Sequence, residues 1–351
     1  MHHIGVDLGA RKSQVCICTP DAAVVLERKL PTSDLCSWFG SQREKYGDAR
    51  IVLESCAQAR FVAMSLIALG FDVCILPATY SKECGVGRRR RKTDRHDARS
   101  LAQASCRNDL PRVHVASDQS EYAKSLCPAR DALVRCRTLL INSVRGYARK
   151  SLLRIPTGRV TTFSKRVRTR MLSLPEGIPT FIESLLKTID AATAELRELE
   201  KKIVGLVNND PVCRLLMTAP VGPLTAIRYR AQVDDVKRFH SAKSVSSYFG
   251  LTVGEDSSGE REHRTSISKA GNTAVRHLLI QSSWAAWRTR PEDPLVRWAK
   301  EIAKRRGVKI AVVAIARKLA GILFAMWRGD KPYDPLYEQR RVPQAKKATV
   351  A

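Results

Sequence analysis

The order of short β-rich and helical segments near the start of this chain limits its possible folds more than any other feature. Three β-rich runs follow one another at residues 3–9, 13–20 and 23–31, separated by turn residues, which predicts neighbouring antiparallel strands. A helix is then expected over 33–46, a strand over 50–55, a helix over 60–69 and a strand over 71–77. This β-β-β-α-β-α-β order predicts an α/β domain built on a mixed sheet.

The remainder of the chain is predicted to be mainly helical. Residues 118–153 have a strongly basic helical pattern in which Pro128 marks a start or a kink. Residues 154–180, rich in Pro, Gly and Thr, indicate a linker or a poorly packed excursion. A heptad-spaced seam follows, made of Leu185, Ile189, Ala192, Leu196, Leu199, Ile203 and Leu206. It predicts either one helix of a bundle or an antiparallel or intermolecular coiled coil, and the spacing does not choose between them.

These patterns divide the chain into a first domain over 1–155, a linker and coiled-coil helix over 156–209, a second domain over 210–340 and a tail over 341–351. The apolar stretch 310–327 carries Arg317 and Lys318 in its middle, which indicates a buried globular helix rather than a membrane span. We expect no signal peptide and no membrane association.

The charge of the chain indicates a polyanionic partner. It has 61 Lys and Arg residues against 34 Asp and Glu, a formal net charge of +27, and phosphate neutralisation is the usual source of affinity for nucleic acids. Generic basic solubility, or a ribosome-like structural role, is the alternative. The ten cysteines form no CxxC pair and no zinc spacing, so we interpret them as small buried hydrophobic residues in a reducing, cytoplasmic setting.

Four acidic residues stand out in this basic chain. Asp7 and Glu54 each end an apolar run, and Asp94 and Asp97 follow a basic run that contains Arg88, Arg89, Arg90, Arg91 and Lys92. Metal-dependent strand cleavage needs several carboxylates that converge from separate elements, because hard cations prefer oxygen ligands. The four residues therefore predict a divalent metal site beside phosphate. Taken singly, Asp94 and Asp97 could instead serve a helix N-terminus, and Asp7 a turn.

The string around Asp7, GVDLGARKS, also resembles the first phosphate loop of actin-like kinases and chaperone ATPases. Those proteins need a second Asp-Gly phosphate loop later in the chain. The nearest string here, VDDVKRF, lacks the glycines, so this alternative is not preferred.

A second candidate site is the serine-rich segment after residue 250. Ser258 lies near Arg264, Lys269 and Arg276, and a serine nucleophile needs nearby groups that stabilise the charge on a scissile phosphate. The residues alone do not distinguish this site from an ordinary Ser-Ser-Gly turn.

Together the two constellations resemble the DEDD-type insertion-sequence transposases, a group of bridge-RNA-guided serine recombinases related to the Piv-type DNA invertases. The resemblance covers nearly the whole chain. Its motifs are GVDLGARKSQVCI, VLES, KTDRHDARSLAQ, TAPVGPLTA, RFHSAKSVSSYFGLT, SSGEREHRTSISKAGNTAVRHLL and KRRGVKIAVVAIARKLAGILFAMW.

The resemblance implies a RuvC-like ribonuclease H fold for the first domain and a mainly helical transposase domain at the C-terminal end. It implies that Asp7, Glu54, Asp94 and Asp97 bind Mg²⁺ and that Ser258, or its neighbour Ser257, is the nucleophile. It also implies donor and target DNA, a structured bridge RNA and a homo-oligomer, dimer or tetramer, as partners. Arg88, Arg89, Arg90, Arg91, Lys92, Arg264, Lys269 and Arg276 would then contact nucleic acid.

Three positions depart from the family pattern: Val253 and Thr265 replace a usual proline and glycine, and the turn at residues 219–223 is one residue short. None of them removes a proposed catalytic group. The expected function is thus site-specific DNA recombination in a bacterial cytoplasm. The alternatives are a RuvC-like hydrolytic nuclease, in which metal-bound water attacks, and an inactive nucleic-acid-binding relic of a transposon.

Overall fold

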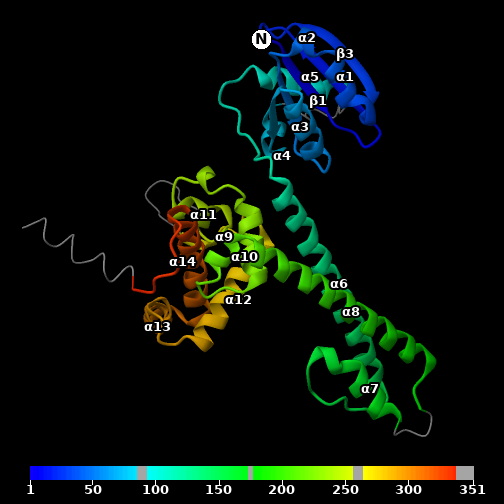
Figure 1. The fold of residues 1–351 in the computed structure, drawn as a ribbon, viewed down its shortest axis with the longest axis vertical. Helices are drawn as coiled ribbons and strands as arrows, with labels where there is room; N and C mark the ends of the chain where they lie inside the picture. The colour runs from blue at the N-terminus through cyan, green and yellow to red at the C-terminus, as the bar shows by residue number, and fades with distance from the viewer. Residues whose placement is uncertain (85–92, 173–176, 256–263, 337–351) are drawn as a thin grey trace, which may run out of the picture. The chain divides into compact units, whose positions relative to one another are not determined.

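The computed structural model describes residues 1–84, 93–172, 177–255 and 264–336. The chain forms two compact units, Met1–Ala116 and Ser117–Ala351 (Figure 1). The division falls after residue 116 because the long helix that follows it packs on helices of the second unit. The expected domain boundaries at residues 155, 209 and 340 remain predictions.

The first unit is built on a five-stranded mixed sheet with the order β3-β2-β1-β4-β5. Its strands are β1 His3–Asp7, β2 Lys12–Cys18, β3 Val24–Pro31, β4 Arg50–Glu54 and β5 Asp72–Leu76. The first three strands pair antiparallel, whereas β4 is parallel to β1 and β5 is parallel to β4. The five predicted strands and the mixed α/β architecture are confirmed.

Alternate side chains of the sheet enter different cores, as the period of two in a β-strand requires. On one face Ile51 and Leu53 pack with α1 (Leu35–Ser41) and α3 (Ala59–Ala68), which cover that face. On the other face Val52 packs against α5 (Asp94–Ser105). The helix expected over 33–46 is divided into α1 and α2 (Arg43–Tyr46), with α4 (Ala78–Glu83) following β5.

The described residues of the second unit are mainly helical and include a small two-stranded hairpin. Its helices are α6 Asp118–Lys150, α7 Phe163–Leu172, α8 Thr180–Asn209, α9 Pro211–Leu216, α10 Pro223–Val233, α11 Ala242–Tyr248, α12 Thr273–Thr289, α13 Pro294–Arg306 and α14 Val308–Gly329. The two strands β6 Val253–Glu255 and β7 Arg264–Ile267 pair antiparallel.

The apolar seam of α8 packs against α6 of the same chain. Arg130 of α6 pairs with Glu200 near the end of α8, at 2.6 Å, while Val144 near the end of α6 shares a core with Leu186 near the start of α8. The two helices are therefore antiparallel neighbours within one chain, as expected for a helix of a bundle or an antiparallel coiled coil. An intermolecular coiled coil stays a prediction. Pro128 lies inside α6 and does not mark its start.

The segment expected to be a linker or a poorly packed excursion contains a packed helix. Phe163, Val167 and Met171 of α7 are at most 1% exposed and lie in one core with Val144 and Leu186. The prediction was wrong because only three apolar side chains, four residues apart, hold this helix in a segment dominated by Pro, Gly, Thr and basic residues.

Helix α14 is long and apolar enough, by length and composition alone, to cross a membrane. In the structure Leu319, Ala320 and Leu323 are fully buried in the largest core of the second unit. Its apolar character is thus used in packing, as expected for a globular core helix.

Candidate active site

The structure places Asp7 and Glu54 side by side at one edge of the sheet. Strands β1 and β4 are parallel, and Val6 pairs with Leu53 in their register. The next residue on each strand is Asp7 or Glu54, and both side chains are half-buried. The carboxyl ends of two neighbouring parallel strands therefore present two carboxylates to the same region, and the Ser81 hydroxyl donates to Glu54 Oε1 at 2.7 Å.

A close backbone contact brings the start of α5 to this edge. A Cβ atom on Gly5 of β1 would lie 2.1 Å from the carbonyl oxygen of Ala98, so α5 crosses β1 where only glycine fits. At the other end of both elements, His3 Nδ1 and Ser105 Oγ form a hydrogen bond of 2.9 Å. Helix α5 thus runs antiparallel to β1, and Asp97, the residue before Ala98, lies toward the strand end that carries Asp7.

The first turn of α5 is also attached to strand β3. Glu27 pairs with Arg95 and, at 2.7 Å, with Arg99, and the hydrogen bond from Arg95 lowers the pKa of the Glu27 carboxyl. Lys29 Nζ lies 2.7 Å from Asp94 Oδ2. Sequence reasoning missed these contacts, because Glu27 and Lys29 are separated from α5 by more than sixty residues.

The structure also tests the capping interpretation of the aspartates. The N-cap of α5 is Thr93, whose Oγ1 accepts from the His96 amide at 3.3 Å. Asp94 therefore does not cap the helix. Its side chain is 57% exposed, whereas Asp97 is 3% exposed.

The donor chemistry of these residues suits a hard cation, because carboxylate oxygens are the ligands that Mg²⁺ prefers. Within the described part of the chain, however, no three His, Cys, Asp or Glu residues lie close enough to hold one metal ion. The structure thus brings Asp7, Glu54 and Asp97 to one edge without assembling a complete metal site. Arg88, Arg89, Arg90, Arg91 and Lys92 lie outside the described residues.

The predicted nucleophile also lies outside the described residues, as do both Ser257 and Ser258. The strands that flank them are described, and Val253 of β6 pairs with Ile267 of β7. Two glycines hold the base of this hairpin. Gly250 and Gly271 have φ of 66° and 76°, and a Cβ on either would lie within 2.1 Å of a backbone oxygen of the opposite segment.

Arg276 is buried behind the hairpin base. It is 8% exposed, and its Nη1 donates to the carbonyl oxygens of Phe249 and Ala270 at 2.9 and 3.0 Å. The guanidinium thus holds together the two segments that cross at the glycines, a structural role that the sequence did not predict. Lys269, by contrast, is exposed and adopts a positive φ of 54°. The Arg264 side chain is outside the described residues.

All ten cysteines are free, and five of them are buried. Burial raises the pKa of Cys16 and of Cys213 to about 12. These thiols therefore act as small packing residues, as expected, whereas Cys56 and Cys136 are exposed.

Comparisons with known proteins match two separate segments of the chain to transposase families. Residues 4–150 match the DEDD transposase family of IS110, described as "Transposase". Residues 213–295 match the family described as "Transposase IS116/IS110/IS902 family".

Similar whole proteins carry related descriptions. A probable family 20 transposase of Pseudomonas aeruginosa is 29% identical, over 95% of this chain and 99% of the relative. The transposase for insertion sequence element IS1111A of Coxiella burnetii is 28% identical, over 94% and 90% of the two chains. A pilin gene-inverting protein of Moraxella bovis is 24% identical, over 73% and 71%. This chain therefore carries two transposase domains of the IS110/IS116 family, a DEDD domain over residues 4–150 and a second domain over residues 213–295.

Proposed function

We propose that this transposase is a site-specific DNA recombinase that cuts and rejoins strands through a serine nucleophile, Ser258. The observation that carries the metal-dependent part of the proposal is the convergence of β1, β4 and α5, which brings Asp7, Glu54 and Asp97 to one edge of the sheet. The role of Ser258 rests on the family resemblance. Asp94 lies three residues before Asp97, on the same face of the helix. These four residues would hold Mg²⁺, which when bound would stabilise charge on the phosphate.

We infer that the first unit is a RuvC-like ribonuclease H domain. Its strand order, 3-2-1-4-5, with three antiparallel strands followed by two parallel ones, supports this assignment. Such a domain presents carboxylates at the ends of its central strands, where Asp7 and Glu54 lie.

The chemistry assigned to Ser258 conserves the number of phosphodiester bonds. Its Oγ forms a bond to phosphorus as the bond to one strand oxygen breaks. The proton that the serine hydroxyl gives up is balanced by the one that the released strand oxygen takes up to become a hydroxyl group. Attack by a strand hydroxyl on the phosphoserine then restores a DNA phosphodiester and the serine. The balance needs no external energy source.

The proposed partners are donor and target DNA together with a structured bridge RNA that pairs with both. The chain would act as a dimer or tetramer in which the carboxylates of one protomer work with the serine of another, in a bacterial cytoplasm. The net charge of +27 supports a polyanionic partner. The resemblance to RNA-guided recombinases supports the RNA and the oligomer.

The decisive experiment traps the covalent intermediate. The protein is incubated with its co-purifying RNA, Mg²⁺ and a nicked duplex that carries the flanks of its own insertion sequence, so that the cleaved strand diffuses away. We expect a protein–DNA adduct with the unmodified chain and with Ser257→Ala, and complete loss of the adduct with Ser258→Ala. Cleavage without any adduct would instead identify a hydrolytic nuclease, and binding without strand breakage would identify a relic.

A further inference from the structure

The far end of the α6–α8 pair carries a dense group of basic residues. Residues 145–172 contain no Asp or Glu, although the whole chain has 34 among 351 residues. The same segment contains nine basic residues, namely Arg145, Arg149, Lys150, Arg154, Arg159, Lys165, Arg166, Arg168 and Arg170. We call this segment, which spans the end of α6, the following loop and α7, the basic tip.

We propose that the basic tip binds the phosphodiester backbone of a nucleic-acid duplex. This inference deepens the proposed function, because it assigns a place at which a nucleic-acid partner is held. The inference depends on the proposed function only for which nucleic acid is bound, and not for the binding itself.

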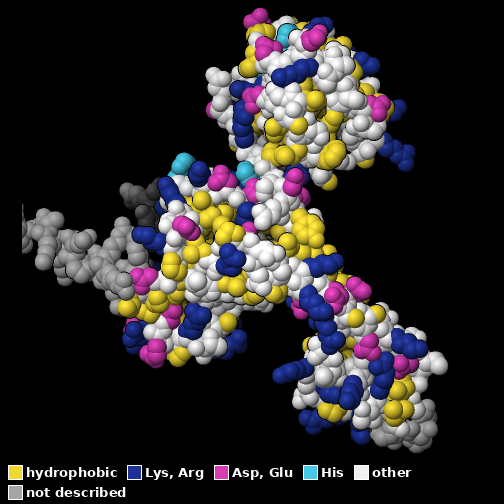
Figure 2. All heavy atoms as spheres, viewed as in Figure 1, with side chains coloured by type: hydrophobic (Ala, Val, Ile, Leu, Met, Phe, Trp, Pro, Cys, Tyr) yellow, Lys and Arg dark blue, Asp and Glu magenta, His cyan; other side chains and the backbone are white. Residues whose placement is uncertain are grey.

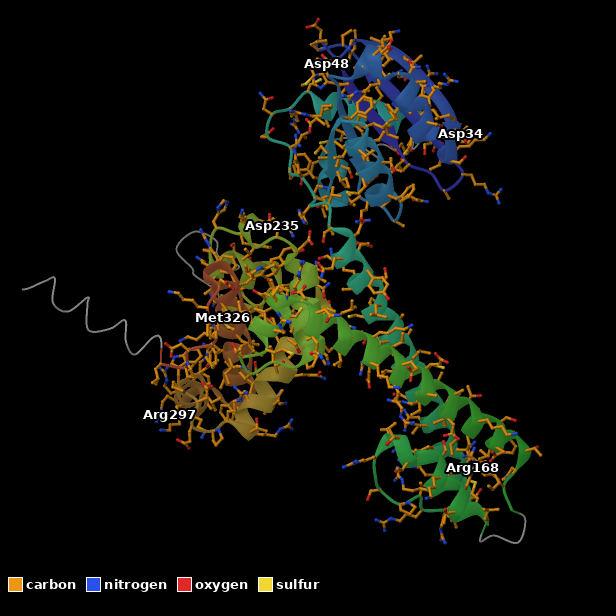
Figure 3. All side chains as sticks on the ribbon, in the orientation of Figure 1. Asp34, Asp48, Arg168, Asp235, Arg297 and Met326 are labelled. Atoms are coloured by element: carbon orange, nitrogen blue, oxygen red, sulfur yellow. The ribbon has the colours of Figure 1, made fainter. Side chains whose placement is uncertain are left out.

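The backbone of the basic tip is held in a defined conformation. The apolar face of α7, through Phe163 and Val167, packs into the core between α6 and α8. Arg168, labelled in Figure 3, lies between α7 and α8 and pairs with Glu183 at 2.9 Å and with Asp190 at 2.8 Å. These two carboxylates raise the pKa of Arg168.

A second arginine organises the loop before α7. Arg166 donates to the carbonyl oxygen of Arg159 at 2.9 Å and to that of Pro156. Arg166 and Arg168 are thus used internally, and they hold in place the backbone that carries the other basic residues. Preorganisation of this kind lowers the entropy cost of binding.

The remaining basic side chains point outward from three consecutive elements. Figure 2 shows Lys and Arg side chains gathered over the α7 end of this unit. The exposed residues are Arg145, Arg149, Lys150, Arg154, Arg159, Lys165 and Arg170. A mainly basic surface spread over several elements suits a regularly spaced row of phosphates, since phosphate contacts require charge but no particular base sequence.

The other end of the α6–α8 pair shows what an ordinary solvated helix face looks like in this chain. There Glu195, Glu198 and Glu200 alternate with basic residues, Lys201 pairs with Glu198 at 2.8 Å and Arg130 with Glu200. Acidic and basic side chains that pair in this way largely neutralise each other, so this surface does not attract a polyanion. The basic tip has no acidic residues of its own. Its exposed residues Arg149, Arg154 and Lys165 present positive charge to the solvent, where an external anion can reach them.

The test compares two triple charge reversals on the same pair of helices. The tip variant carries Arg149→Glu, Arg154→Glu and Lys165→Glu. The control variant carries Arg197→Glu, Lys201→Glu and Lys202→Glu, three exposed residues of α8, and changes the net charge by the same amount. Fluorescence anisotropy of the full chain with duplex DNA, and separately with a hairpin RNA, gives Kd over a range of NaCl concentrations. Circular dichroism verifies that both variants remain helical.

We expect the tip variant to bind more than about 10-fold more weakly than the control and to lose about three units of the slope of log K against log salt. Loss confined to DNA, or to RNA, identifies which duplex the tip holds. The proposal would be overturned if the two variants had the same Kd and the same salt dependence, whether both bound like the unmodified chain or both lost the same affinity. The Ser258→Ala chain should bind like the unmodified chain, so failure of the nucleophile assignment and failure of the tip assignment are distinguishable.

Discussion

The proposed carboxylate residues and the hairpin that flanks the proposed nucleophile are held in position by different kinds of structure. The carboxylates of the first unit project from the ends of β1, β4 and α5, where strand register and helix packing position them. The hairpin that flanks Ser258 depends instead on a buried backbone crossing held by Gly250, Gly271 and Arg276. Substitutions at the carboxylates should therefore change chemistry with little change in folding, whereas substitutions at the hairpin base should act through folding.

The largest expected effect is at Asp97, and it tests whether the carboxylates act on chemistry rather than on folding. Asp97→Asn keeps the size of the side chain and removes a charge that a metal needs. Strand cleavage in Mg²⁺ should fall by more than about 100-fold, because even indirect partners of metal ligands contribute 10- to 100-fold. Asp48→Asn, at a residue whose side chain is 67% exposed, is the matched control. Unchanged cleavage by the Asp97 variant would remove this residue from the proposed metal site.

The next effect concerns the hairpin base. In Gly271→Ala the new Cβ would lie 2.0 Å from the carbonyl oxygen of Tyr248, at a φ of 76°. We expect a loss of about 2–4 kcal/mol in the free energy of unfolding, from the left-handed backbone and the overlap together. Urea denaturation measures this loss.

The control for this variant is Gly146→Ala on α6, where a Cβ meets nothing within 4 Å. It should stabilise by up to about 1 kcal/mol, since alanine favours helix. Equal stabilities of the two alanine variants would show that the crossing does not support the hairpin.

A smaller effect is the pH dependence that His3 confers on the first unit. Burial and the nearby Arg50 lower the pKa of His3 below its ordinary value of 6.5. A lowered pKa means that the unfolded chain binds the proton more readily. The contribution of neutral His3 is therefore complete above pH 6.5 and is lost as the pH falls through the folded value.

His3→Gln should flatten the thermal stability profile between about pH 7 and pH 5. Melting temperatures of the full chain across this range provide the measurement. A profile as steep as that of the unmodified chain would assign the dependence to other groups.

The smallest effect is at the ion pair between Lys29 and Asp94, whose side chains are 50% and 57% exposed. Lys29→Ala should change stability by less than about 1 kcal/mol, as is usual for exposed pairs. Because Asp94 would lose a competing cation, the Mg²⁺ concentration for half-maximal cleavage should fall by at most about fivefold. An increase would mean that Lys29 helps to orient the carboxylate.

Much of the first unit could be predicted because its signals are local. Alternating apolar runs such as residues 50–55 predict strands, and an acidic residue at the end of such a run predicts a carboxylate at a sheet edge. The contacts of Glu27 with Arg95 and Arg99 could not be predicted in this way. They depend on where α5 crosses the sheet, which no local pattern records.

The sequence by itself determined the succession of strands and helices, the family motifs and the positions of the four carboxylates along the chain. Only the tertiary structure decided that the α8 seam pairs with α6, that α7 is packed, and that Arg276 faces the protein interior. The physical reason is that periodicity shows which face of an element is apolar but not which partner covers it. A basic side chain likewise has the same sequence signature whether it donates to buried carbonyl groups, as Arg276 does, or extends into solvent, as Arg149 does.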